Sequence, residues 1–370
     1  MKLKNIKRKW RSEGCGKTLK YILEMLKARF DNKIIRIKNN ISSFIDRLYF
    51  SEVNVSDFNE KLLYIYSPVW GDKFLELFFN YNIPSVIQEG NFPRLKNDGY
   101  NLVLYMYTEI ENIDMIYINY EREIKWIKDY ATLKIIPMEN YQGKDRNELL
   151  FNSLIKHIEK CIDDRAIMIH NAPDFLWGNN SIWNAIKIGE NKGVCVGSGH
   201  CRISLEAIND SDELHKFMNR EATIENDQLV DLAIKYSHSS LYKSFDNNKN
   251  NATYCGISIR QISTNIYSVI HNLPSVDIIK YLDQDLVFFN NSKTYNSWDK
   301  TWTRFLLKEN RVKIIGSSDL VFKVEITSNK QHSAVTSPDL LNNDKYLTRN
   351  KRHLQHYVCN SFVCSWRGRG

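Results

Sequence analysis

Long apolar runs are missing from this 370-residue sequence, and none approaches the roughly 18 residues that a membrane-spanning helix requires. The basic residues that follow Met1 lead into no apolar segment, so we expect no secretory signal. Paired cysteines are missing as well, because the seven that are present are scattered along the chain. Such cysteines are typical of reduced thiols, and we expect a cytoplasmic protein.

Several catalytic motifs are also absent. The sequence contains no nucleophile elbow, no Gly-x-Gly-x-x-Gly fingerprint, no protein-kinase motif set and no His-Glu-x-x-His. The segment Gly14-Cys-Gly-Lys-Thr18 resembles the end of a phosphate-binding loop, but Arg11 stands where that loop needs a glycine. These absences argue against several large classes of enzyme.

Positive charge is concentrated in one segment. The first 50 residues hold 14 Lys and Arg against 4 Asp and Glu, whereas the rest of the chain is close to neutral. Apolar residues recur there at helical spacing from Leu19 to Phe30, which predicts a basic helical arm. The arm either packs on the body of the protein or lies on an anionic membrane at its inner face. The near-neutral body argues against nucleic acid as a partner.

From residue 60 onward, apolar runs alternate with segments of helical periodicity. Runs that recur about every 30 to 40 residues predict βαβ units and an α/β fold with a mostly parallel, Rossmann-like sheet flanked by helices. Each run is nearly continuous, as in strands that are covered on both faces. The predicted strands are residues 62–66, 101–107, 133–137 and 166–170, and the predicted helices are residues 72–81, 109–129 and 146–161.

After residue 205 the pattern changes to short helices and β-rich stretches, which predicts a smaller mixed α+β half. The polar tract 246–251 predicts a loop. The predicted organisation is an arm (1–55), an α/β half (56–207), a mixed α+β half (208–330) and a C-terminal tail (331–370).

Asp174 follows Pro173 just after the predicted strand 166–170. Ligands of open α/β sheets bind outside the carboxyl ends of the strands. A carboxylate there can hold Mg²⁺ or Mn²⁺, which would bridge a diphosphate and stabilise the leaving group. A surface turn is the other interpretation, and a neighbouring second acid is missing because position 172 is Ala.

Three residues of the first βα loop are candidates for donor binding: Ser67, Trp70 and Gly71. Backbone N–H groups at the start of the following helix can meet a phosphate, and Trp70 can stack on a base or ribose. A capped turn with a core tryptophan is the competing interpretation.

Four later residues complete the candidates. Arg202 follows a Gly-rich loop and can clamp a phosphate or carboxylate, or it is a surface residue of a turn. Asp283 and Asp285 form an Asp-x-Asp that can chelate one cation, or they lie in a solvated turn. His271 can activate an acceptor, although a lone histidine on an apolar stretch is often structural.

Four short segments carry a resemblance to bacterial glycosyltransferase-like proteins over roughly residues 60–330: Tyr66-Ser-Pro-Val-Trp-Gly71, Phe78-Phe-x-x-x-Ile-Pro-Ser85, Gly90-Asn-Phe-Pro93 and Ala172-Pro-Asp174. In these proteins a Trp-Gly loop follows the first strand. A Pro-Asp takes the place of the Asp-x-Asp of nucleotide-sugar transferases with the GT-A fold. The resemblance implies a GT-A-like sheet, a nucleotide-sugar-binding half at 56–207 and an acceptor-side half at 208–330. The departure from a full Asp-x-Asp leaves metal dependence open.

We therefore expect a glycosyltransferase that moves a sugar from a nucleotide-sugar to a saccharide or glycolipid acceptor in bacterial surface polysaccharide synthesis. The expected donor-binding residues are Ser67, Trp70, Gly71, Asp174 and Arg202, the expected metal ligand is Asp174, and the expected catalytic residues are His271, Asp283 and Asp285. The alternative is a non-catalytic glycan- or protein-binding module that its basic arm tethers to a membrane surface.

Overall fold

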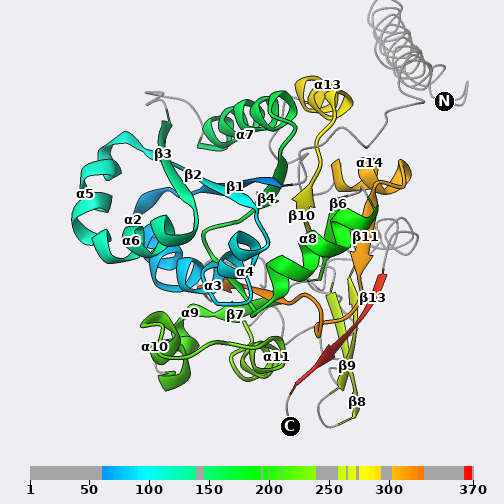
Figure 1. The fold of residues 1–370 in the computed structure, drawn as a ribbon. Helices are drawn as coiled ribbons and strands as arrows, with labels where there is room; N and C mark the ends of the chain where they lie inside the picture. Colours follow the sequence, from blue (N-terminus) through cyan, green and yellow to red (C-terminus); the bar gives the residue numbers. More distant parts are fainter. Residues whose placement is uncertain are drawn as a thin grey trace, which may run out of the picture. The chain divides into compact units, whose positions relative to one another are not determined.

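A computed structural model describes residues 61–138, 146–192, 195–199, 201–209, 211–238, 257–263, 266–271, 275–292, 302–328 and 362–368. The chain divides into two units, Met1–Asn54 and Val55–Gly370, and every described residue belongs to the second. The predicted arm, the loop 246–251 and most of the predicted tail lie outside the described residues. The elements (Figure 1) are β1 (Leu62–Pro68), α2 (Gly71–Leu77), η2 (Phe78–Asn82), α3 (Ile83–Val86), α4 (Phe92–Asn97), β2 (Asn101–Glu109), η3 (Ile110–Asn112), α5 (Ile113–Asn119), α6 (Glu121–Tyr130), β3 (Thr132–Met138), α7 (Arg146–Asp163), β4 (Ile167–His170), β5 (Phe175–Trp177), α8 (Ser181–Lys192), β6 (Cys195–Ser198), β7 (Cys201–Ser204), α9 (Leu205–Ile208), α10 (Asp212–Met218), α11 (Asn226–Lys235), β8 (Ile257–Ser263), β9 (Ile266–His271), β10 (Ser275–Ile279), α13 (Asp283–Ser292), α14 (Thr303–Lys308), β11 (Val312–Ile315), β12 (Lys323–Thr327) and β13 (Phe362–Arg367).

A seven-stranded sheet has the order β11-β6-β10-β4-β1-β2-β3. It includes the four strands predicted between residues 62 and 170, which are β1, β2, β3 and β4. Strands β4, β1, β2 and β3 are parallel to one another, and β6 is parallel to β11. Strand β10 lies between β4 and β6 and is antiparallel to both. The predicted α/β class with a mostly parallel, Rossmann-like sheet flanked by helices is confirmed.

Alternate side chains of the central strands enter two different cores, because successive residues of a strand point to opposite faces. Leu63 and Ile65 of β1 pack in the core that includes residues of α2, α4 and α8. Tyr64 and Tyr66 pack on the other face, in the core that includes residues of α7 and α13. Figure 1 shows α7 and α13 above the sheet and α2, α4 and α8 below it. Burial on both faces explains the continuous apolar and aromatic run that predicted this strand.

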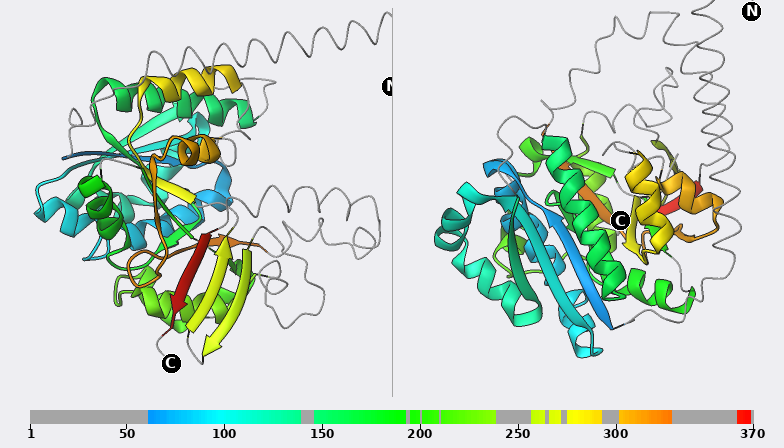
Figure 2. Two further views of the ribbon diagram at one scale, coloured as in Figure 1. Left: turned by 90° about the vertical axis from the view of Figure 1, so that its right-hand side faces the viewer. Right: turned by 90° about the horizontal axis from the view of Figure 1, so that it is seen from above.

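Two three-stranded sheets complete the described fold. One has the order β5-β12-β7, with β12 antiparallel to β5 and parallel to β7. The other has the order β13-β9-β8 and is antiparallel throughout. Figure 2 shows β13 beside β9, so the described end of the predicted tail is a strand.

The two predicted halves share the large sheet. Strands β10 and β11 come from residues 208–330, yet they join strands from residues 56–207. The predicted helix 109–129 begins later than expected, because β2 extends to Glu109 before η3, α5 and α6 follow. In the part of the chain that the structure describes, no helix is both long and apolar enough to cross a membrane.

Candidate functional site

The order of the strands reverses next to β1. The chain runs outward from β1 through β2 to β3 and then returns to place β4 on the other side of β1. Strands β1 and β4 are parallel, with Tyr66 opposite His170, so they end at the same edge of the sheet. Ligands of open α/β sheets bind outside the carboxyl ends of the strands at such a point. The residues that follow β1 and β4 therefore form the candidate site.

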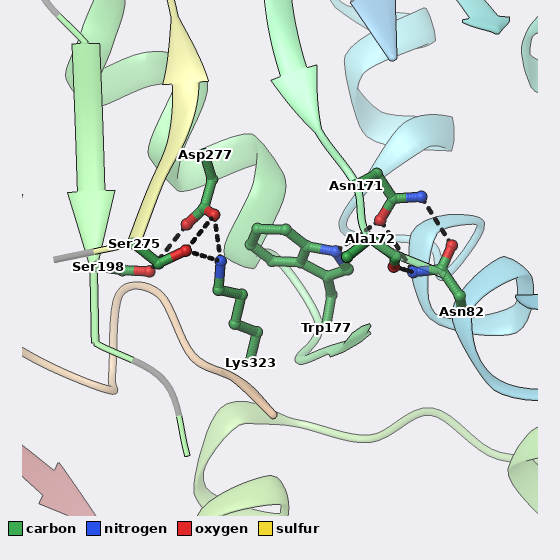
Figure 3. Close-up of polar contacts among 8 residues, drawn as sticks. All are labelled: Asn82, Asn171, Ala172, Trp177, Ser198, Ser275, Asp277 and Lys323. Atoms are coloured by element: carbon green, nitrogen blue, oxygen red, sulfur yellow. Dashed lines mark hydrogen bonds and ion pairs between the residues drawn. The ribbon is translucent and has the colours of Figure 1, made fainter. Parts of the chain in front are cut away.

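Buried side-chain amides fix the loop that follows β4. Asn82 Nδ2 donates hydrogen bonds to Asn171 Oδ1 at 2.9 Å and to the backbone oxygen of Ala172 at 3.1 Å. Trp177 Nε1 donates to the same Asn171 oxygen at 3.0 Å (Figure 3). Asn82 belongs to the π-helix η2, a rare kind of helix that frequently occurs at functional sites. This amide network holds the loop that carries Asp174.

The two faces of the small sheet β5-β12-β7 differ, because one is apolar and the other carries Glu325 and Arg202 beside the buried rings of Phe175 and Trp177. Its apolar face packs in a core with residues of α10 and α11. Its register places Glu325 opposite both Phe175 and Arg202, so these three side chains share the other face. Asp174 directly precedes β5, and its backbone oxygen accepts a hydrogen bond from the N–H of Ile326 at 2.8 Å. The sheet therefore brings residues far apart in sequence to the end of β4.

Four charged side chains interact at this place, and we call Asp174, Glu325, Arg202 and Lys73 the charged cluster. Arg202 Nε donates to Glu325 Oε1 at 2.9 Å, and Thr327 Oγ1 donates to the same oxygen at 3.1 Å. The charges of Glu325, Arg202 and Lys73 all act on the carboxyl group of Asp174. Each member keeps part of its surface in solvent.

The carboxyl group of Asp174 has a perturbed protonation equilibrium. Its pKa is raised to about 8, first because the surrounding chain removes water and next because Glu325 is negatively charged. The cations of Arg202 and Lys73 oppose this shift in the pKa of Asp174. The raised pKa means that this carboxyl group binds a proton more readily than an exposed aspartate, and a bound metal cation would displace that proton. Such perturbed groups concentrate at functional sites.

A buried ion pair starts on the same strand as Glu325. Lys323 of β12 contacts Asp277 of β10, and its Nζ donates to Ser275 Oγ at 2.9 Å. Ser198 Oγ of β6 donates to Asp277 Oδ2 at 3.2 Å (Figure 3). Burial lowers the pKa of Lys323, while the negative charge of Asp277 opposes that change. The pair ties the small sheet to the large one.

The structure places the three predicted residues of the first βα loop in framework contacts. Ser67 is fully buried, and its Oγ accepts a hydrogen bond from the amide network at 3.1 Å. Trp70 packs on Phe74, with ring centres 5.0 Å apart. Gly71 has a φ of 69°, which favours glycine, and its N–H donates to Glu109 Oε2 at 3.2 Å. The carboxylate of Glu109 therefore already lies at the start of α2, where a phosphate was expected.

Asp283 and Asp285 lie at the opposite edge of the large sheet. Strand β10 is antiparallel to β4, so α13, which follows β10, begins beyond the amino end of β4. Asp285 is fully buried and accepts hydrogen bonds from Arg311 Nη1 at 2.7 Å and Nη2 at 2.8 Å. The structure thus brings the predicted residues Asp174 and Arg202 together in the charged cluster. It leaves Asp283 and Asp285 apart from them. His271 ends β9, and its side chain lies outside what the structure describes.

The sequence patterns did not indicate Lys73 or Glu325. Glu325 supplies a second acid near Asp174, which the neighbouring sequence lacks because position 172 is Ala. A signal was present, because Lys323 and Glu325 are polar at alternate positions of the β-rich stretch predicted for residues 312–326, and Thr327 continues the alternation just after it. That spacing is typical of a strand with one polar face. The spacing does not indicate which strands lie beside it.

The charged cluster has few candidate metal ligands. Among the described residues, no group of three or more His, Cys, Asp or Glu could hold a metal ion. The cluster contains two carboxylates, Asp174 and Glu325. Proteins usually hold Mg²⁺ through one or two carboxylates together with water and substrate phosphates, and seldom through a complete protein cage. The donor set therefore fits a cation that binds together with a phosphate-containing substrate.

No protein-family model matches the chain, and the curated proteins contain no match to it. Among solved structures, it is similar to 4-diphosphocytidyl-2C-methyl-D-erythritol synthase from Anaerococcus prevotii DSM 20548, with 11% sequence identity and a TM-score of 0.24. The alignment covers 40% of this chain and 58% of that chain, so this chain spans little more than half the length of the synthase. At this TM-score the likeness carries no inference about activity.

Proposed function

We propose that the protein is a glycosyltransferase that moves a sugar from a nucleotide-sugar donor to a saccharide or glycolipid acceptor. The observation that carries this proposal is the charged cluster, in which two carboxylates and two cations interact at the end of β4. The cluster adjoins the point where the strand order reverses, the usual ligand site of open α/β sheets. The choice of sugar transfer in surface polysaccharide synthesis comes from the resemblance of residues 66–93 and 172–174 to glycosyltransferase-like proteins.

The charges of the cluster suit a diphosphate leaving group. Breaking the bond between the sugar and the diphosphate leaves negative charge on the departing oxygen. Arg202 and Lys73 would stabilise that charge, because preorganised cations at developing charge are a large contribution to catalysis. Asp174 and Glu325 would hold Mg²⁺ or Mn²⁺, which supplies further stabilisation of the diphosphate when it is bound.

The surroundings of Asp174 favour a preorganised site. The amide network fixes the loop before it, and the hydrogen bond from Ile326 fixes its backbone oxygen. Catalytic groups must be held close to their productive geometry, and supporting hydrogen bonds provide that restraint. The position of this carboxyl group therefore depends on residues from β1, η2, β5 and β12 together.

A donor screen tests the proposal. We expect the protein to hydrolyse or transfer from at least one nucleotide-sugar when Mn²⁺ is present. Asp174→Asn should lower kcat/KM for that donor by about 100-fold or more, the loss typical of removing one group that stabilises the transition state. Asp163→Asn is the matched control, because Asp163 is exposed at the end of α7, on the edge opposite the cluster.

Two outcomes would contradict the proposal. Full turnover by an Asp174→Asn protein with an unchanged thermal unfolding curve would remove Asp174 from the site. Calorimetry that finds glycan or protein binding, but no nucleotide-sugar binding with or without Mn²⁺, would instead support the non-catalytic binding module.

A further inference from the structure

Two arginine–carboxylate pairs in the described part of the chain differ in how tightly they are enclosed. Arg311 binds Asp285 through both terminal nitrogens, and the side chains are 14% and 0% exposed. Arg202 binds one oxygen of Glu325 through Nε, and these side chains are 27% and 15% exposed. Solvated pairs contribute little to stability, whereas breaking a desolvated pair is costly. The Arg202–Glu325 pair should therefore cost less to break than the Arg311–Asp285 pair.

We propose that Arg202 holds Glu325 in the free protein and turns to the diphosphate of the donor when it binds, which releases Glu325 to the divalent cation beside Asp174. The inference rests on the proposed function and deepens it, because it assigns an order of partners to residues of the same cluster.

The exchange follows from the charges of the cluster. A divalent cation alone must compete with Arg202 for Glu325, and a diphosphate alone must compete with Glu325 for Arg202. When both ligands bind, the phosphates take the guanidinium and the cation takes the carboxylate. Every charge then has a partner of opposite sign, so each ligand strengthens the binding of the other. Arg202 thus acts on metal binding without being a metal ligand.

Binding of Mn²⁺ alone and of pyrophosphate alone tests the exchange in the full chain at fixed pH. Free Mn²⁺ can be followed by electron paramagnetic resonance, and pyrophosphate binding by calorimetry. Arg202→Gln should bind Mn²⁺ about tenfold more tightly than the wild type, because Glu325 is released, and pyrophosphate about tenfold less tightly. Glu325→Gln should shift both affinities in the opposite directions.

Two controls separate partner exchange from a general change of charge. Lys73→Gln removes another cation that acts on the cluster but leaves the Arg202–Glu325 bond, so it should improve Mn²⁺ binding less than Arg202→Gln does. In a Glu325→Gln background, Arg202→Gln should improve Mn²⁺ binding no more than Lys73→Gln does, because the carboxylate that it releases is gone and only the loss of one positive charge remains. Thermal unfolding confirms that each variant is folded.

The outcomes separate this inference from the proposed function. An Arg202→Gln protein with unchanged or weaker Mn²⁺ affinity overturns the exchange. A gain in Mn²⁺ affinity that is undiminished in the Glu325→Gln background, or that Lys73→Gln matches in the wild-type background, overturns it as well. Turnover of a nucleotide-sugar by the wild type would keep the proposed function intact in each of these cases. A wild type that neither turns over a donor nor binds Mn²⁺ together with pyrophosphate overturns both.

Discussion

Replacement of Lys323 by methionine should destabilise the protein by about 3 to 5 kcal/mol at pH 7, the typical cost of breaking a buried ion pair. The Lys323 side chain is fully buried, and its Nζ contacts Asp277 and Ser275. Methionine keeps most of the apolar stem, so the change removes a charge and little packing. The Asp277 carboxylate is then left buried, with hydrogen bonds from the hydroxyl groups of Ser198 and Ser275.

Protonation of Asp277 limits how much unfolding free energy the Lys323→Met variant can lose. A buried carboxylate that loses its cation can take up a proton and become neutral. For an aspartate that ionises near pH 3.9 in the unfolded chain, this uptake costs about 4 kcal/mol at pH 7 and about 1.5 kcal/mol at pH 5. The native variant then binds more protons than its unfolded state, so its unfolding free energy falls as the pH rises. The destabilisation by Lys323→Met should therefore shrink between pH 7 and pH 5.

Urea unfolding at both pH values measures the effect. Asp277→Asn should also destabilise the protein, and the double variant should regain about 2 kcal/mol or more relative to the sum of the single changes. Lys313→Met, at an exposed lysine of β11, is the matched control and should change the stability by less than about 0.5 kcal/mol. A loss below about 1 kcal/mol for Lys323→Met at pH 7, or an equal loss at pH 5, would refute the reasoning.

Two further predictions concern buried polar groups. Burial lowers the pKa of His157 to about 3, below the value near 6.5 that it has when unfolded, so stability should be lost as the pH falls from 6.5 towards 3. This group lowers the free energy of unfolding by about 3 kcal/mol at pH 4.5. In urea unfolding, the free energy of unfolding of His157→Phe should therefore fall less between pH 6.5 and 4.5 than that of the wild type. Equal declines in the two proteins would contradict this prediction. Asn171→Ala should cost about 2 to 4 kcal/mol in thermal unfolding, because Trp177 Nε1 loses its acceptor and Asn82 loses its hydrogen bonds to Asn171. An unchanged unfolding temperature would contradict the role of the amide network.

The strands of the large sheet were predictable where local pattern determines them. The run at residues 62–66 became β1, and the run at residues 101–107 became β2, because each buries both faces and must be apolar throughout. The insertion of β10 between β4 and β6 was not predictable, because its position depends on contacts with strands more than 70 residues away. Strand alternation indicates which side chains share a face but not which strands become neighbours.

The candidate site was predictable only in part for the same reason. Asp174 and Arg202 follow apolar runs or glycines, and those local signals indicated them. Glu325 comes near Asp174 only through the register of β12 with β5, which no short pattern encodes. Lys323 would be expected in solvent from its residue type alone, since lysine is rarely buried without a partner. Its partner, Asp277, lies on a strand of the other sheet.

The buried ion pair has a structural consequence for the charged cluster. A buried pair adds little net stability over apolar residues of similar size, so its contribution here must lie elsewhere. Lys323 and Glu325 occupy the same face of β12, and a one-residue slip of this strand would exchange its two faces. Such a slip would move Glu325 into the apolar core and separate Lys323 from Asp277. Because both changes leave charges buried without partners, the pair makes the wrong register costly and keeps the second carboxylate near Asp174.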